Sequence, residues 1–136
     1  MKKLLFITCM FISVLVFAQE SANTELGVYD FDTEIIDYGT IEKNAKKNRF
    51  FKFKNTGKSP ILITSVRATC GCTVAKKPSK PILPNETGTI EVNYDTNRIG
   101  AFSKTITVSS NASEKSKILR IKGIVLDSEN SKLVSK

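Results

Sequence analysis

Histidine and tryptophan are absent from the 136-residue sequence, and methionine occurs only twice. Without histidine the chain cannot build a Ser-His-Asp triad, a Cys-His dyad or a histidine-ligated zinc or haem site. Beyond the N-terminal segment, no apolar run approaches the about 20 residues that a membrane-spanning helix requires. These absences argue against the common catalytic and multispanning membrane classes, and the length suits one ordinary domain.

The N-terminal segment has the pattern of an export signal. Two lysines come first, residues 4–17 are almost wholly apolar, and Ala18 supplies the small residue of a signal-peptidase site. The apolar run is too short to span a bilayer comfortably. We expect cleavage between Ala18 and Gln19, without a lipid, because Cys9 lies inside the apolar run rather than after it. The chain is therefore predicted to be exported, to the periplasm or the cell surface.

The predicted mature chain is basic. The net charge of the whole sequence is +8, and removal of the two N-terminal lysines leaves +6. Such a charge favours anionic surfaces such as phosphorylated lipid head groups. The lysines and arginines are scattered rather than gathered in one run, and no nucleic-acid-binding motif is present. We interpret them as solvated strand and loop residues and expect no nucleic-acid partner.

Isoleucine, valine and threonine outnumber leucine and alanine more than twofold after residue 18, which favours strands. Alternation of apolar and polar residues predicts strands at 28–38 (with a break near Thr33), 48–54, 61–67, 89–95, 101–109 and 117–125. The inward positions of these strands are predicted to include Phe51, Phe53, Ile90, Val92, Tyr94, Phe102, Ile106, Val108, Leu119, Ile121 and Val125.

The segments between these strands are predicted from their turn residues. The Asn55-Thr56-Gly57-Lys58 signal predicts a hairpin between 48–54 and 61–67. Residues 39–47 are expected to be a polar connector, and 75–87, with three prolines, a loop or an edge crossover.

About seven short strands without an amphipathic helix predict an all-β domain. The fitting architecture is an immunoglobulin-like antiparallel β-sandwich over residues 28–125, with a small barrel as the alternative. A short linker (19–27) is expected before it and a polar tail (126–136) after it.

Cys70 and Cys72, separated by Gly71, are the one unusual chemical feature of the predicted mature chain. On an extended strand their Cβ atoms would lie ~7 Å apart, whereas a disulfide requires about 3.8 Å. A bridge would therefore need Gly71 to kink the backbone. It would close so short a loop that the chain-entropy model assigns it only roughly 1.6 kcal/mol. Stabilisation of the fold by a disulfide is therefore, by itself, a weak explanation of the motif.

Three other interpretations of the cysteine pair stay open. A strained pair is easily reduced and could exchange with a partner thiol, helped by the nearby Arg67, Lys76 and Lys77. Two thiolates could instead hold a soft metal ion such as Cu(I), with further ligands from acidic side chains or a second chain. The plainest interpretation, which we favour, is two small, partly buried residues at a strand end, bonded or not as their surroundings dictate. The residues indicate no catalytic set and no cofactor site.

Six short blocks follow one another in a characteristic order: FKFKNTG (51–57), TCGCT (69–73), PNETG (84–88), IEVNYD (90–95), GAF (100–102) and LRIKG (119–123). This order resembles the bacterial secreted family called domain of unknown function 1573, over roughly residues 29–125. The TCGCT block is the specific part. The resemblance implies a secreted immunoglobulin-like domain with a cysteine pair of unknown use, and it supplies no reaction.

We therefore expect an exported, non-catalytic immunoglobulin-like domain that acts as a binding or structural module in the cell envelope. Its expected partner is an unknown envelope protein, with no small-molecule substrate. Sheet edges and the loop from Cys70 to Pro84 are the expected contact surfaces, because an exposed edge can pair with an added strand. The alternative is a thiol-dependent redox or soft-metal-binding protein that uses Cys70 and Cys72.

Overall fold

A computed structural model of the protein describes residues 25–127. The expected signal peptide, its cleavage position between Ala18 and Gln19, and the tail from residue 128 lie outside these residues. No helix in the described part could cross a membrane. Eight strands follow one another along the described chain: β1 (Tyr29–Phe31), β2 (Ile35–Glu42), β3 (Asn48–Asn55), β4 (Ile63–Ala68), β5 (Thr73–Lys76), β6 (Thr87–Tyr94), β7 (Gly100–Ser110) and β8 (Ser116–Leu126).

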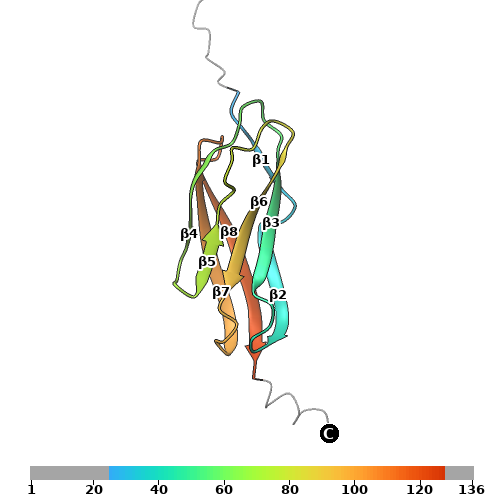
Figure 1. Cartoon of the computed structure of the whole chain (residues 1–136), viewed down its shortest axis with the longest axis vertical. Helices are drawn as coiled ribbons and strands as arrows, with labels where there is room; N and C mark the ends of the chain where they lie inside the picture. Colours follow the sequence, from blue (N-terminus) through green and yellow to red (C-terminus); the bar gives the residue numbers. More distant parts are fainter. Residues whose placement is uncertain (1–24, 128–136) are drawn as a thin grey trace, which may run out of the picture.

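The strands form two four-stranded sheets packed face to face (Figure 1). One sheet, which we call sheet A, has the order β1-β3-β6-β5, and the other, sheet B, has the order β2-β8-β7-β4. This arrangement confirms the predicted all-β, immunoglobulin-like sandwich. It is not wholly antiparallel, because β2 runs parallel to β8 along the edge of sheet B.

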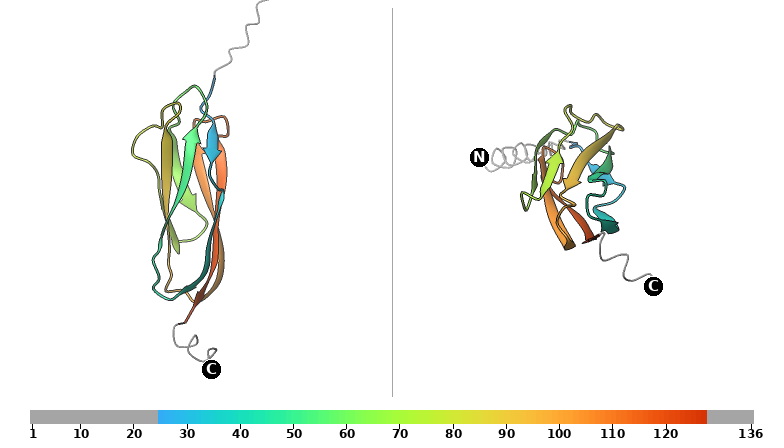
Figure 2. Two further views of the ribbon diagram at one scale, coloured as in Figure 1. Left: turned by 90° about the vertical axis from the view of Figure 1, so that its right-hand side faces the viewer. Right: turned by 60° about the horizontal axis from the view of Figure 1, so that its bottom comes forward.

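The expected strand at 28–38 is two strands that belong to different sheets. β1 pairs with β3 in sheet A, and β2 pairs with β8 in sheet B. The predicted break near Thr33 is where the chain crosses between the layers, as the left view of Figure 2 shows. There the Thr33 hydroxyl donates to the carbonyl of Ile35 at 2.8 Å. β2 then continues to Glu42, so the connector expected at 39–47 is wrong over its first four residues.

The hairpin predicted between residues 48–54 and 61–67 is also wrong. β3 lies in sheet A between β1 and β6, whereas β4 lies at the edge of sheet B beside β7. The turn after Asn55 is real, but it carries the chain from one layer to the other instead of pairing its flanking strands. The expected loop at 75–87 likewise begins inside β5. A turn signal shows where a chain reverses, and only tertiary packing decides which sheet receives it.

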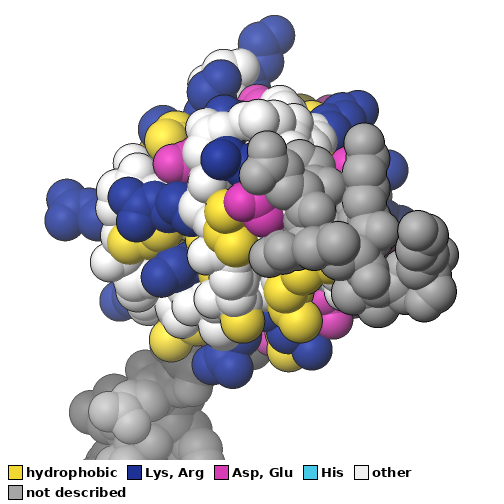
Figure 3. Space-filling view, turned by 90° about the horizontal axis from the view of Figure 1, so that it is seen from below, with side chains coloured by type: hydrophobic (Ala, Val, Ile, Leu, Met, Phe, Trp, Pro, Cys, Tyr) yellow, Lys and Arg dark blue, Asp and Glu magenta, His cyan; other side chains and the backbone are white. Residues whose placement is uncertain are grey.

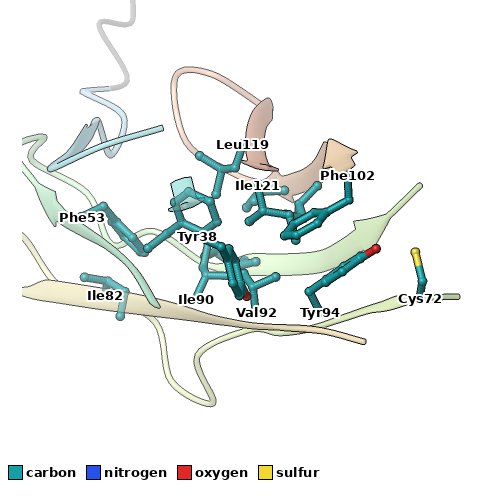
Figure 4. Packing of buried hydrophobic residues seen from close by; sticks show 14 of the residues in the cluster. Tyr38, Phe53, Cys72, Ile82, Ile90, Val92, Tyr94, Phe102, Leu119 and Ile121 are labelled. Atoms are coloured by element: carbon teal, nitrogen blue, oxygen red, sulfur yellow. The ribbon is translucent and has the colours of Figure 1, made fainter. Parts of the chain in front are cut away.

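The core lies between the two sheets, and the predicted inward residues are all buried there. Phe51, Phe53 and Ile90 from sheet A, for example, are fully enclosed. Near the end of the sandwich where the cysteines lie, the rings of Tyr94 and Phe102 stack with their centroids 3.7 Å apart. Figure 4 shows these two rings next to Cys72, so the cysteine pair borders the aromatic end of the core.

Candidate functional site

The Cys70–Gly71–Cys72 segment forms the turn that joins β4 to β5, and so links sheet B to sheet A. On the β4 side, the Thr69 N–H donates to the carbonyl of Thr105 at 3.0 Å. On the β5 side, the Asp95 N–H donates to the carbonyl of Cys72 at 2.8 Å. Both ends of the turn are therefore held by the neighbouring ladders. Figure 1 shows it at the lower left, between the two adjacent edge strands.

The two cysteines face one another across this turn. Their Cα atoms lie 5.3 Å apart, inside the range that disulfides occupy, and their sulfur atoms are in contact. Cys72 is buried with 7% of its surface exposed, whereas Cys70 is half-buried. The Thr73 hydroxyl lies 3.9 Å from each sulfur. Both residues lie next to a strand end, as expected, but only Cys70 is partly buried, because Cys72 belongs to the buried core.

The turn does not depend on glycine in the way the sequence suggested. Gly71 is absent from the residues with positive φ among those described. A Cβ atom added at Gly71 would meet nothing within 4 Å. The backbone bends in a region that other residues also adopt. Gly71 is therefore tolerated here rather than required.

A shallow hollow of about 260 Å³ adjoins the turn, lined by Lys47, Gly71, Cys72, Val74, Asn93, Tyr94 and Asp95. Lys47, from the loop before β3, is the cation that comes to this hollow. Of the three cations that the sequence placed near the cysteines, Lys76 instead faces Glu91 at 3.8 Å. Arg67 and Lys77 do not line the hollow. Sequence proximity could not reveal Lys47, because it approaches from a strand connection 25 residues away.

The electrostatics of the hollow come from Asp95 and its neighbours. The Asp95 carboxylate accepts the Asn97 backbone N–H, and this bond lowers the pKa of Asp95 below its ordinary value. The charges of Lys47 and Arg98 act in the same direction. Burial, by contrast, raises the pKa of the neighbouring Tyr94 hydroxyl. The hollow thus holds the Asp95 carboxylate, one lining cation, Lys47, and the Tyr94 phenol, while Arg98 contacts Asp95 from outside the lining at 3.5 Å.

Among residues 25–127, no group of three or more acidic or cysteine side chains is arranged to hold an ion.

Basic side chains are distributed widely over the surface. Figure 3 shows lysines and arginines dispersed around the rim of the lower end, with hydrophobic side chains between them. No single basic patch dominates this face.

Solved structures of similar shape share the fold at low sequence identity. A protein of unknown function from Porphyromonas gingivalis W83 has a TM-score of 0.65 and 15% identity, over 78% of this chain and 51% of that one. The ASH/PapD-like domain 7 of human CEP192 has a TM-score of 0.59 and 10% identity, over 85% and 97%. The Pseudomonas aeruginosa CupB2 chaperone has a TM-score of 0.54 and 9% identity, over 78% and 61%. The chain thus spans about half of the Porphyromonas protein, and these likenesses establish the fold alone.

No curated protein matches the sequence. A family profile described as "Protein of unknown function (DUF1573)" matches residues 29–125, from the first residue of β1 to the last residue but one of β8. This span covers most of the chain and agrees with the family predicted from the six sequence blocks. The chain therefore belongs to the DUF1573 family.

Proposed function

We propose that the protein is an exported binding module of the cell envelope, which acts through contacts with another protein. The observation that carries the proposal is the pair of open edges on one side of the sandwich. β4 ends sheet B and β5 ends sheet A, and the cysteine turn joins them. Open edges present unpaired backbone groups that an added strand can use. The solved PapD-like domain and chaperone share this fold, and the fold is compatible with binding an added strand.

Export and contact can be tested together in intact cells. A photo-crosslinking amino acid at exposed Thr64, on β4, should give a discrete adduct in the envelope fraction. The same group at exposed Phe50, on the outer face of sheet A, is the matched control and should give none. The mature protein should begin at Gln19 by mass. An N-terminus at Met1 in the cytoplasmic fraction would contradict export, and equal labelling at both positions would contradict a defined contact side.

We further propose that Cys70 and Cys72 form an intrachain disulfide that shapes the turn. The support is their 5.3 Å Cα separation and the contact of their sulfur atoms. Because the closed loop is short, the double variant Cys70→Ser, Cys72→Ser should lose only about 1–2 kcal/mol of unfolding free energy. Urea denaturation of the oxidised protein and the variant measures this loss.

The half-buried state of Cys70 keeps thiol exchange as the second candidate function. In that reaction a partner dithiol would be oxidised to a disulfide, while the Cys70–Cys72 bond would be reduced to two thiols. Acid trapping and alkylation in cells separate the candidates. A fully oxidised pair, and a Ser variant that still forms the Thr64 adduct, would support the structural role. A mixed thiol population that changes with a partner's redox state would favour exchange.

A further inference from the structure

Three of the four open sheet edges carry features that discourage an added strand. β1 has only three residues. β2 is interrupted by a bulge at Gly39, whose φ is +67°. β5 has four residues and runs directly into Lys77 and Pro78. Short length, bulges, lysine and proline are the devices by which edges are protected from pairing. β4 also has a register shift, between Ile63 and Ser65, but its residues 65–68 pair regularly with β7 and include no lysine or proline.

The backbone groups of β4 alternate between its partner strand and the open side. Thr69 bonds to Thr105 of β7, and β4 keeps the same register with β7 from Ser65 to Ala68. In an antiparallel ladder every second residue directs its N–H and C=O toward the partner. The groups of Val66 and Ala68 therefore point away from β7. Among the described residues, neither forms a backbone bond outside the ladders.

Small apolar side chains lie beside this free edge. Val66, Ala68 and Cys70 pack partly against the core and stay partly exposed, and Ala75 of β5 does the same from the other sheet. Together they leave an incompletely covered apolar strip along the open side of the sandwich. A strand added to β4 would place every second side chain over this strip. Apolar side chains at these positions would complete its burial.

The segment that contains β4 and β5 carries charges of one sign, although Lys76 is paired with Glu91 of β6 and Asp95 lies beside the cysteine turn. From Ser59 to Asn85 the sequence contains no aspartate or glutamate, and it contains Arg67, Lys76, Lys77 and Lys80. β7, which pairs with β4, is also free of acidic residues. Arg67 is exposed on β4, where its side chain lies on the face opposite to that of Val66. The outward residues of an added strand would thus meet positive charge, which favours acidic side chains.

We infer that β4 accepts an extended partner segment in which apolar and acidic residues alternate, with the apolar side chains over the strip and the acidic ones beside Arg67. This assignment rests on the proposed binding function and names its contact strand and the chemistry of its partner. The added segment would extend sheet B by one strand at the lower part of β4. The upper limit is set by Ile82, which already pairs with Ile61 through two hydrogen bonds of 2.9 Å.

The probe for this test is a seven-residue capped peptide of alternating valine and aspartate. Titration into the ¹⁵N-labelled protein should shift the amide signals of Val66 and Ala68 first. Binding should weaken as salt rises, because the attraction is between exposed charges. Arg67→Glu should weaken binding at least about fivefold, since it replaces attraction by repulsion. Arg120→Glu, at another exposed position in the same sheet, is the matched control and should change binding little.

Backbone pairing has its own test. Because only one edge of an added strand faces β4, N-methylation of either the valine amides or the aspartate amides should abolish binding, and methylation of the other set should spare it. Equal tolerance of both sets, or shifts that centre on another strand, would overturn the assignment. If the Thr64 crosslinker still captures a partner in cells while Val66 and Ala68 do not respond to the peptide, the binding function stands and this ligand class is wrong. Loss of both results would overturn both proposals.

Discussion

Asn55→Ala should lower the unfolding free energy by more than about 3 kcal/mol, although Asn55 lies far from the cysteine turn. Its side chain is fully buried at the end of β3. The side-chain oxygen accepts the N–H groups of Val28 and Gly57 at 3.2 and 3.0 Å. The side-chain nitrogen donates to the carbonyls of Ser59 and Ile82 at 2.8 and 2.9 Å. One amide thus joins three chain segments, and its removal leaves buried groups unpaired.

Urea denaturation followed by circular dichroism measures this effect. Asn93→Ala is the matched control, because Asn93 is a half-buried asparagine of sheet A that donates one side-chain bond, to Glu91 at 3.1 Å. Its loss should cost less than about 1 kcal/mol. Similar losses for the two variants would contradict the role of Asn55 as a buried junction. If Asn55→Ala does not fold, Asn55→Ser, whose hydroxyl can still accept the Gly57 N–H as the asparagine does, should give a smaller, measurable loss.

Asn55 also shows how far local sequence could predict the fold. Its place before Gly57 correctly marked a turn, because asparagine and glycine are common where chains reverse. Nothing local indicated that the side chain would be enclosed or would bind Ile82, 27 residues away. The same limit explains the wrong hairpin. Alternation located β3 and its inward residues, but the sheet that receives β4 is decided by long-range pairing with β7.

The cysteine turn was found from sequence, but its surroundings were not. The spacing of Cys70 and Cys72 marked the motif, and the expected need for a backbone bend was correct. The special role given to Gly71 was wrong, because its φ is not positive and space surrounds it. Lys47 precedes β3 and Tyr94 ends β6, and the pairing of these two strands brings both residues to the neighbouring hollow. Their residue types alone carry no signal of that meeting.

The composition of the sequence also could not show that β4 is an edge strand. The pattern of residues 61–67 predicts one strand among several. A strand can be identified as an edge strand only when the order of strands in its sheet is known. The protective features of the other edges were visible one by one, such as Pro78 after β5. These features could be compared between edges only after the topology showed which four strands are edge strands. What sequence did supply is the absence of acidic residues across this region, which the topology then places along one open side.

Gly88→Val should destabilise the protein by more than about 3 kcal/mol through steric overpacking. Gly88 is buried in β6, where a Cβ atom would collide with the ring of Phe53 and lie 2.8 Å from Cγ1 of Ile82. The backbone of Gly88 does not have positive φ, so conformational strain is not the cause. Valine is also the better strand former, so propensity alone predicts the opposite sign. The expected loss therefore isolates the packing between β6 and its neighbours.

Gly71→Val is the matched control for this steric effect. A Cβ atom at Gly71 meets nothing within 4 Å, and the position is exposed, so the change should stay within about 0.5 kcal/mol. Urea denaturation compares both variants with the parent protein. An unchanged or higher stability for Gly88→Val would contradict the tight packing. Because Ile82 pairs with Ile61 just before β4, a displaced Ile82 should also broaden the amide signal of Ile61 in Gly88→Val, whereas Gly71→Val should leave that signal sharp.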